Sequence, residues 1–213
     1  MDRSINVSNL NFWHEKSVIL KDISLFLGKN EKIAILGENG VGKSTLLKIL
    51  AGILEAKEAK ITILGNEIES LSDFKSIREN IGYLPQNLGS FFIFPTALED
   101  ISFSLKVKGV KEAKKLSEEL LKKFDLEYLK DSSIWKLSEG EKQIVALLAT
   151  IIKSPKILLL DEATSFLDDK NKNRVFNFLE KYEGSVILIS HEQKLPSFFK
   201  RYVLNETLEH LGS

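Results

Sequence analysis

The chain of 213 residues contains no cysteine, only four prolines and no long uninterrupted apolar run. Without cysteine there is no disulfide, no thiolate nucleophile and no zinc–sulfur site, which suits a reducing compartment. A membrane-spanning helix needs roughly 18–20 apolar residues, and the best candidate, residues 144–152, is shorter and predicts a buried helix instead. The first ten residues also lack the apolar core of a signal peptide. We therefore expect a protein with no membrane span of its own.

An excess of charge of either sign is also missing. Lysine and arginine together number 30, and aspartate and glutamate together number 30. Because a neutral chain has no overall attraction to polyanions, we expect no nucleic-acid partner, and any phosphate must be bound at a local site.

Short apolar runs alternate with segments of helical spacing along most of the chain. This pattern predicts an α/β fold with a mostly parallel sheet covered on both faces, an antiparallel region near the N-terminus and an inserted helical lobe. The expected strands are residues 4–9, 17–27, 31–36, 59–64, 80–84, 157–161 and 186–190, and the expected helical segments are 43–53, 98–123 and 139–153.

A glycine-rich stretch, GENGVGKST, follows the expected strand 31–36 and leads into the helix from Lys43. It matches the phosphate-binding pattern G-x-x-x-x-G-K-S/T, in which glycines let backbone amides turn toward phosphate oxygens. In this pattern Lys43 reaches the β- and γ-phosphates and the Ser44 hydroxyl holds Mg²⁺. A plain turn before a helix is the alternative, but the strand before and the helix after both favour a nucleoside triphosphate. The predicted binding residues are Gly37, Glu38, Asn39, Gly40, Val41, Gly42, Lys43, Ser44 and Thr45.

An acidic pair, Asp161 and Glu162, follows the apolar run 157–160. Ligands of parallel sheets collect at the carboxyl ends of the strands, where this pair is expected to emerge. Asp161 is then placed to support Mg²⁺, and Glu162 to polarise a water for attack on the γ-phosphate. A solvated strand end is the alternative for the pair taken alone.

Four further motifs resemble those of ATP-binding cassette (ABC) ATPases and occur in the order of that family. LSEGE at 137–141 resembles the signature motif, SFLD at 165–168 the D-loop, Gln86 the Q-loop and His191 the switch histidine. The resemblance extends from about residue 4 to about residue 205. It implies a single ABC ATPase domain over 1–213 with a P-loop NTPase core. Residues 1–85 and 155–205 would form the RecA-like core and the antiparallel β-subdomain, and 86–154 the α-helical subdomain.

In the family, ATP lies between two such domains, and the resemblance carries roles to matching residues. Gln86 would contact Mg²⁺ or the attacking water, and His191 the γ-phosphate. The residues implied to contact ATP held by the opposite subunit, or to couple the two sites, are Ser138, Glu139, Gly140, Glu141 and Asp168. Ser138 is alternatively just the N-cap of the helix that follows it. Glu139 departs from the common LSGGQ and brings a negative charge near a phosphate.

An aromatic residue near positions 12–14 is expected to stack on adenine in this family. The candidates are Phe12, Trp13 and His14. Register favours His14, whereas Trp13 offers the larger π-surface and could instead pack into the β-subdomain.

The segment from Gln86 to Val110 is similar to the corresponding region of energy-coupling-factor (ECF) ATPases. This implies an importer of vitamins or metal ions, with the ATPase at the inner face of the cell membrane in the cytoplasm. An integral membrane subunit would contact residues Gln86 to Thr96, unless the phenylalanines of FFIFP at 91–95 fill the lobe's own core. ECF ATPases often carry a C-terminal extension, whereas this chain ends soon after the last expected strand.

Two other functions remain open at this stage, and a third is opposed by the sequence. One is a regulatory subunit of a heterodimer with weak hydrolysis, which Glu139 favours and Glu162 and His191 oppose. Another is the ATPase of a small ABC exporter. A P-loop kinase or GTPase has no use for LSEGE, and the chain has DDKNKN rather than the Asn-Lys-x-Asp motif of a GTPase.

Overall fold

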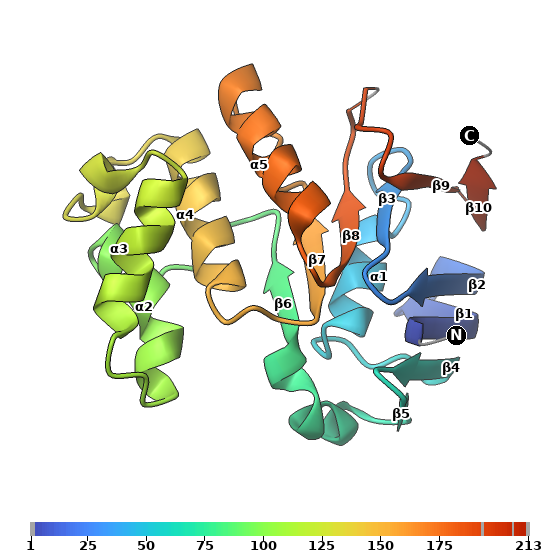
Figure 1. Cartoon of the computed structure of the whole chain (residues 1–213). Helices are drawn as coiled ribbons and strands as arrows, with labels where there is room; N and C mark the ends of the chain where they lie inside the picture. Colours follow the sequence, from blue (N-terminus) through green and yellow to red (C-terminus); the bar gives the residue numbers. More distant parts are fainter. Residues whose placement is uncertain (1–2, 193, 206, 212–213) are drawn as a thin grey trace.

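The computed structural model describes residues 3–192, 194–205 and 207–211. Its centre is a six-stranded sheet in the order β10-β9-β3-β8-β7-β6 (Figure 1). All neighbours are parallel except β10, which pairs antiparallel with β9. The strands are β3 (Lys32–Leu36), β6 (Ile81–Leu84), β7 (Ile157–Asp161), β8 (Ser185–Ile189), β9 (Lys200–Leu204) and β10 (Leu208–Leu211). The predicted α/β class with a mostly parallel sheet is confirmed.

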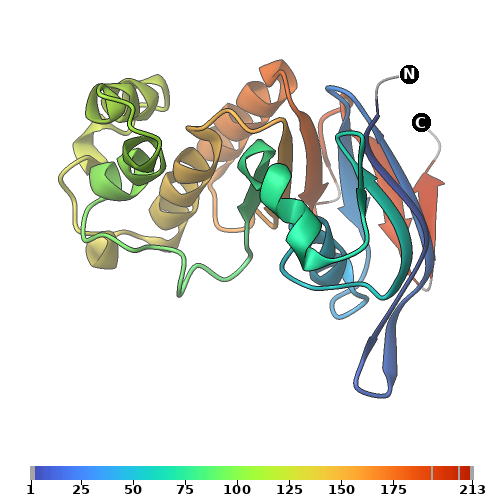
Figure 2. The same cartoon turned by 90° about the horizontal axis from the view of Figure 1, so that it is seen from below.

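A second, antiparallel sheet forms the N-terminal subdomain in the order β2-β1-β4-β5. Its strands are β1 (Arg3–His14), β2 (Ser17–Gly28), β4 (Glu58–Ile63) and β5 (Asn66–Ile68). Helix α1 (Lys43–Leu50) contributes Leu46, Leu47, Ile49 and Leu50 to a core shared by both sheets. The β1–β2 hairpin extends past the rest of the body (Figure 2).

A helical lobe lies beside the parallel sheet and includes α2 (Ala97–Val107), α3 (Ala113–Lys123) and α4 (Glu139–Ile151). The segment expected to be helical over 98–123 is two helices, because the chain turns at Gly109, whose φ is 74°. Helix α5 (Asp169–Lys181) joins the lobe and the sheet in a second core. Short 3₁₀ turns complete the chain at Leu71–Ser76, Arg78–Asn80, Glu127–Leu129 and Ile134–Lys136.

Four elements were not predicted, and the weak apolar pattern of each explains why. Helix α5 buries only Val175, Phe176 and Leu179 of its thirteen residues. Strand β9 has one buried residue and β10 has none, and β5 is only three residues long. The strand expected at 186–190 is therefore not the last one, because β9 and β10 follow it and extend the sheet beyond β3.

Among the described residues, no helix combines the length and apolar character needed to cross a bilayer.

The side chains in the middle of β7 are fully buried. Truncating one of them therefore measures how much core packing contributes to the free energy of unfolding. Leu159 is 0% exposed, whereas Val18 at the far end of β2 is 54% exposed. We expect Leu159→Ala to lower the free energy of unfolding by about 2–5 kcal/mol, since it removes buried methyl groups and leaves a cavity. Val18→Ala should change it by less than about 0.5 kcal/mol. Urea unfolding followed by circular dichroism measures both, and equal effects would contradict the burial of β7.

Candidate functional site

The glycine loop of residues 37–42 connects β3 to α1, as its pattern predicts. Gly37, Gly40 and Gly42 all have positive φ angles, of 142°, 82° and 100°. A Cβ atom at Gly42 would also lie 2.8 Å from the carbonyl oxygen of Ile19 and 2.7 Å from the side chain of Leu20. Position 42 therefore requires glycine for two reasons, its backbone conformation and the close approach of β2.

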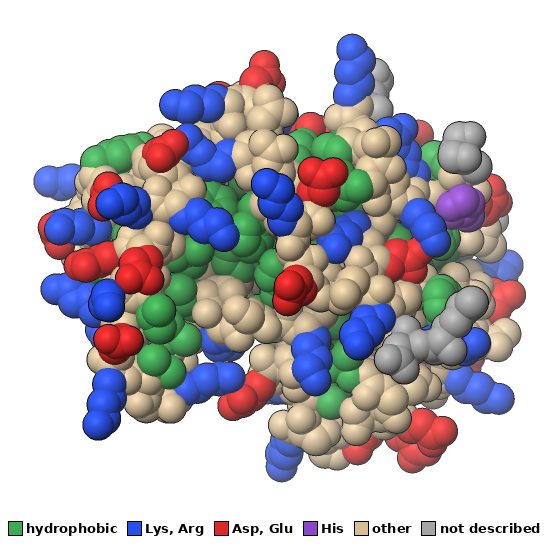
Figure 3. Space-filling view, viewed as in Figure 1, with side chains coloured by type: hydrophobic (Ala, Val, Ile, Leu, Met, Phe, Trp, Pro, Cys, Tyr) green, Lys and Arg blue, Asp and Glu red, His purple; other side chains and the backbone are tan. Residues whose placement is uncertain are grey.

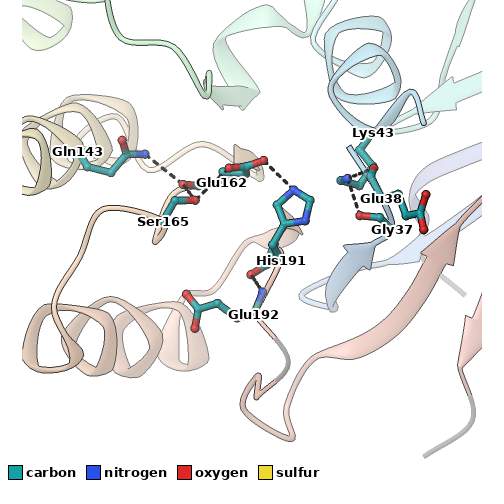
Figure 4. Close-up of polar contacts among 9 residues, drawn as sticks. Gly37, Glu38, Lys43, Gln143, Glu162, Ser165, His191 and Glu192 are labelled. Carbon is teal, nitrogen blue, oxygen red and sulfur yellow. Dashed lines mark hydrogen bonds and ion pairs between the residues drawn. The ribbon is translucent and has the colours of Figure 1, made fainter. Parts of the chain in front are cut away.

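Lys43, the first residue of α1, is only 6% exposed. Its Nζ donates to the backbone oxygens of Gly37 at 2.8 Å and Glu38 at 2.6 Å, which closes the loop around the ammonium group (Figure 4). Burial lowers the pKa of Lys43, while the charges of Glu162 and Asp161 oppose that shift. The loop, one lysine and two carboxylates thus form a single electrostatic site.

Asp161 ends β7 and is 1% exposed. Burial raises the pKa of its carboxyl group, and a hydrogen bond with Ser44 of α1 lowers it. Its Oδ1 atom is buried without a hydrogen-bond partner in the described part of the chain. A buried carboxylate oxygen with free lone pairs beside a serine hydroxyl fits a hard cation such as Mg²⁺.

No group of three or more histidine, aspartate or glutamate side chains suited to a metal occurs among the described residues. Mg²⁺ is usually held by one or two protein groups together with substrate phosphates and water. Ser44 and Asp161 are candidate protein ligands, and Gln86, which follows the neighbouring strand β6, stays the third predicted one.

Glu162 directly follows β7 in a left-handed conformation, with φ 54°. Its Oε1 lies 3.0 Å from Nε2 of His191, and its Oε2 accepts a hydrogen bond from Ser165 Oγ at 3.1 Å (Figure 4). Non-glycine residues in this conformation are uncommon and cluster at functional sites. Two predicted catalytic residues, far apart in sequence, thus meet directly.

Supporting residues appear around Glu162 that sequence reasoning did not single out. Gln143 of α4 donates to the backbone oxygen of Glu162 at 3.5 Å. Thr164 donates to Oε1 of Glu192 at 2.7 Å, next to His191. Ser165 lies one turn after Glu162 in the SFLD stretch, and this spacing is the one signal that could have identified it. Gln143 and Glu192 become neighbours only through the fold.

Ser138 is the N-cap of α4, as predicted, and forms a reciprocal capping box with Glu141. Glu141 Oε2 accepts from the backbone N–H of Ser138 at 2.9 Å and from its hydroxyl at 2.8 Å, and these bonds lower the pKa of Glu141. Glu139 pairs with Lys142 at 2.6 Å. The extra charge that Glu139 brings to this motif is therefore partly balanced within one helical turn.

The LSEGE and SFLD stretches lie against each other. A Cβ atom at Gly140 would come within 2.7 Å of the backbone oxygen of Phe166, so this contact also needs a glycine. Asp168 caps α5 by accepting from the backbone N–H of Asn171 at 2.8 Å. The structure thus brings the predicted trans-contact residues of both stretches together on the lobe side of the molecule.

The remaining predicted residues are placed as follows. Gln86 is exposed two residues after β6, next to the end of β7. In β1, Phe12 packs against the core, whereas Trp13 is 42% exposed and His14 is exposed. Packing into the subdomain therefore applies to Phe12, and Trp13 and His14 stay the stacking candidates.

The FFIFP segment is mostly turned inward. Phe91 and Phe92 pack against the core of the lobe, and Phe94 lies 5.0 Å from the ring of Phe103. The buried carboxylate of Asp100 accepts the backbone N–H groups of Ile93 and Phe94. Only Ile93 of the four apolar side chains from 91 to 94 is largely exposed, at 68%.

Comparison with known proteins places this arrangement in a family. The sequence profile described as "ABC transporter" matches residues 20–165. A relative from Caldanaerobacter subterraneus subsp. tengcongensis, named as an ABC transporter ATP-binding protein, is 34% identical over all of this chain and 93% of its own. One from Clostridium tetani, with the same description, is 36% identical over 94% of this chain. The chain spans only 46% of that second relative's length.

Two solved structures are similar over 98% of the chain. CbiO1 from Clostridium perfringens, described as part of the ABC transporter complex CbiONQ, has a TM-score of 0.83 and 28% identity, with 87% of its chain covered. A dimeric ATP-binding cassette bound to ADP and Pi has a TM-score of 0.85 with 99% of its chain covered, and its 24% identity shows the shared fold. The sequence profile, the relatives and the site together show that this chain belongs to the ABC transporter family of ATP-binding proteins.

Proposed function

We propose that the chain binds ATP with Mg²⁺ and hydrolyses it to power a membrane transporter. The observation that carries this proposal is the shared electrostatic site of Lys43, Asp161 and Glu162 at the carboxyl edge of the parallel sheet. An ordinary solvated strand end would not bury Asp161 beside a buried lysine, because burying charged groups is costly unless they serve each other or a ligand.

Each residue has a defined part in this chemistry. The amides of the glycine loop and the ammonium of Lys43 bind the phosphates, and the N-terminus of α1 adds its positive end. Ser44 and Asp161 hold Mg²⁺, which neutralises phosphate charge when bound. Glu162 accepts the proton of the attacking water, while His191 and Ser165 fix the direction of its carboxylate.

A second subunit completes the site. Ser138 and Gly140 belong to the helical lobe, whereas the glycine loop lies between β3 and α1 on the other side of the molecule (Figure 1). One ATP can meet both groups when two subunits face each other, so ATP would promote dimerisation and hydrolysis would reverse it.

The transporter is proposed to be an importer of the ECF type, for vitamins or metal ions, with this subunit at the inner face of the membrane. The segment Gln86 to Thr96 and the similarity to CbiO1 support this. Gln86 and Ile93 are among the exposed side chains of the segment that a membrane subunit could touch. A regulatory subunit with weak hydrolysis is the second candidate, because Glu139 lies at the signature helix; the Glu162–His191 contact opposes it.

The ammonium group of Lys43 should dominate nucleotide affinity. We expect Lys43→Ala to weaken binding of a fluorescent ATP analogue by at least about tenfold, since a charge-assisted contact to phosphate is lost. Lys57→Ala, which removes an exposed lysine outside the loop, is the matched control. Unchanged affinity in the first variant, with an unchanged melting temperature, would place the phosphates elsewhere.

The carboxylate of Glu162 should matter for turnover rather than for binding. Glu162→Gln keeps the size of the side chain but cannot accept the proton, so we expect ATP hydrolysis to fall by about 10²–10⁴-fold with similar ATP affinity. Glu180→Gln, on the exposed face of α5, should leave both unchanged. Phosphate release measures the rate, and undiminished hydrolysis in Glu162→Gln would show that the base is another residue.

The same variant tests whether two copies of this chain suffice. With hydrolysis blocked, we expect Mg·ATP to shift the mass in light scattering from 24.1 kDa to about twice that value. A monomer that still binds ATP would exclude a self-sufficient motor and would favour a heterodimer with a different ATPase subunit.

A further inference from the structure

An open groove of about 1190 Å³ runs between α3 and α5, over the C-terminal end of α4. Residues 154–156 and 182–184, which precede β7 and β8, close one end of it. It therefore lies by the amino ends of these strands, at the opposite edge of the sheet from Lys43 and Asp161. The function proposed above makes no use of this surface.

The floor of the groove is apolar. Phe178 is central to it, with the rings of Phe124 and Tyr182 at 5.4 and 5.5 Å. Leu116, on the α3 wall, is 38% exposed. Figure 3 shows a hydrophobic patch on this face, in the hollow between the helical lobe and α5, with lysine and arginine side chains around it.

The rim is basic, although the whole chain is neutral. Five lining side chains are cationic, Lys123, Lys156, Lys170, Arg174 and Lys181, against two that are anionic, Glu119 and Glu183. Arg174 already pairs with Asp125 and donates to the backbone oxygen of Phe124. The four lysines are exposed, and Lys123 lies over the ring of Phe178 at 5.6 Å. An occupant must therefore combine an apolar ridge with negative charge on its flanks.

We propose that this groove binds an acidic amphipathic helix of a partner protein. The α5 wall runs from Lys170 to Lys181, about 16 Å at ~1.5 Å per residue, which accommodates about three turns of a docked helix. Helices enter such grooves through apolar side chains at i, i+3, i+4 and i+7. A concave surface receives such a ridge, whereas a flat anionic membrane would touch the rim and leave the floor uncovered.

The partner helix would contact the helical lobe through α3 and the core through α5 at the same time. This interface is distinct from the proposed membrane contact at Gln86 to Thr96, which follows the carboxyl end of β6. The inference does not depend on ATP hydrolysis, and it can be tested on nucleotide-free protein.

The test is a selection from a displayed library of helical peptides about three to four turns long. Leucine is fixed at the positions that face the groove, and each flanking position varies among glutamate, glutamine and lysine. We expect glutamate to be enriched on the flanks, with selected peptides binding the intact chain saturably in fluorescence anisotropy. Enrichment of lysine, or no enrichment, would overturn the proposal.

Charge-reversal variants test whether the selected peptides bind in the groove. Lys123→Glu combined with Lys181→Glu should weaken the selected peptides by at least about tenfold, because two rim charges are reversed. Lys57→Glu combined with Lys60→Glu makes the same charge change in and beside β4, and should leave binding unchanged. Equal losses in both pairs would mean non-specific attraction. Circular dichroism confirms that each variant is folded.

A membrane surface is distinguished by sedimentation with phosphatidylglycerol-rich vesicles. We expect no cosedimentation that depends on Lys123 and Lys181. Vesicle binding that is lost in this pair of substitutions, without competition by a selected peptide, would assign the groove to lipid and overturn the protein partner.

Discussion

Lys43 and Asp161 are both buried at the carboxyl edge of the parallel sheet, and neither charge would be stable there in isolation. The lysine is held by carbonyl oxygens of the loop that precedes it, and the aspartate at the end of β7 is held by Ser44 of α1. This requirement fixes the neighbourhood of β3, β7 and α1. Glu162 and His191 come just after the carboxyl ends of β7 and β8, at this same edge.

The rest of the candidate site depends on contacts between lobe and core. Gln143 of α4 reaches the backbone of Glu162, and Gly140 packs on the backbone of Phe166. A movement of the helical lobe would therefore shift the backbone of Glu162, the residue proposed to activate water. Such a link is what coupling between a membrane subunit and hydrolysis requires.

Elements with a clear apolar or glycine spacing could be predicted from the sequence, whereas elements with few buried side chains could not. Residue spacing and apolar runs predict the glycine loop, the acidic pair and the buried strands β3, β7 and β8. Each of these features is specified by residues that are adjacent in the sequence. Helix α5 and strand β9 bury few side chains, so only tertiary packing defines them. The support of Glu162 by Gln143 and Ser165, and the groove beside α5, arise from residues that the fold brings together.

The hydrogen bonds from Lys43 to the backbone oxygens of Gly37 and Glu38 affect how strongly a phosphate can bind. In the proposed function, incoming phosphate oxygens would compete with these two carbonyls for the hydrogen-bond donors of the ammonium group. The two hydrogen bonds hold the loop around the ammonium group, so we expect little loop conformational entropy to be lost when phosphate binds. The affinity for phosphate then depends on the difference in free energy between the hydrogen bonds of Lys43 to phosphate oxygens and those to the loop carbonyls. A ligand with few phosphate oxygens would gain little from replacing the carbonyls.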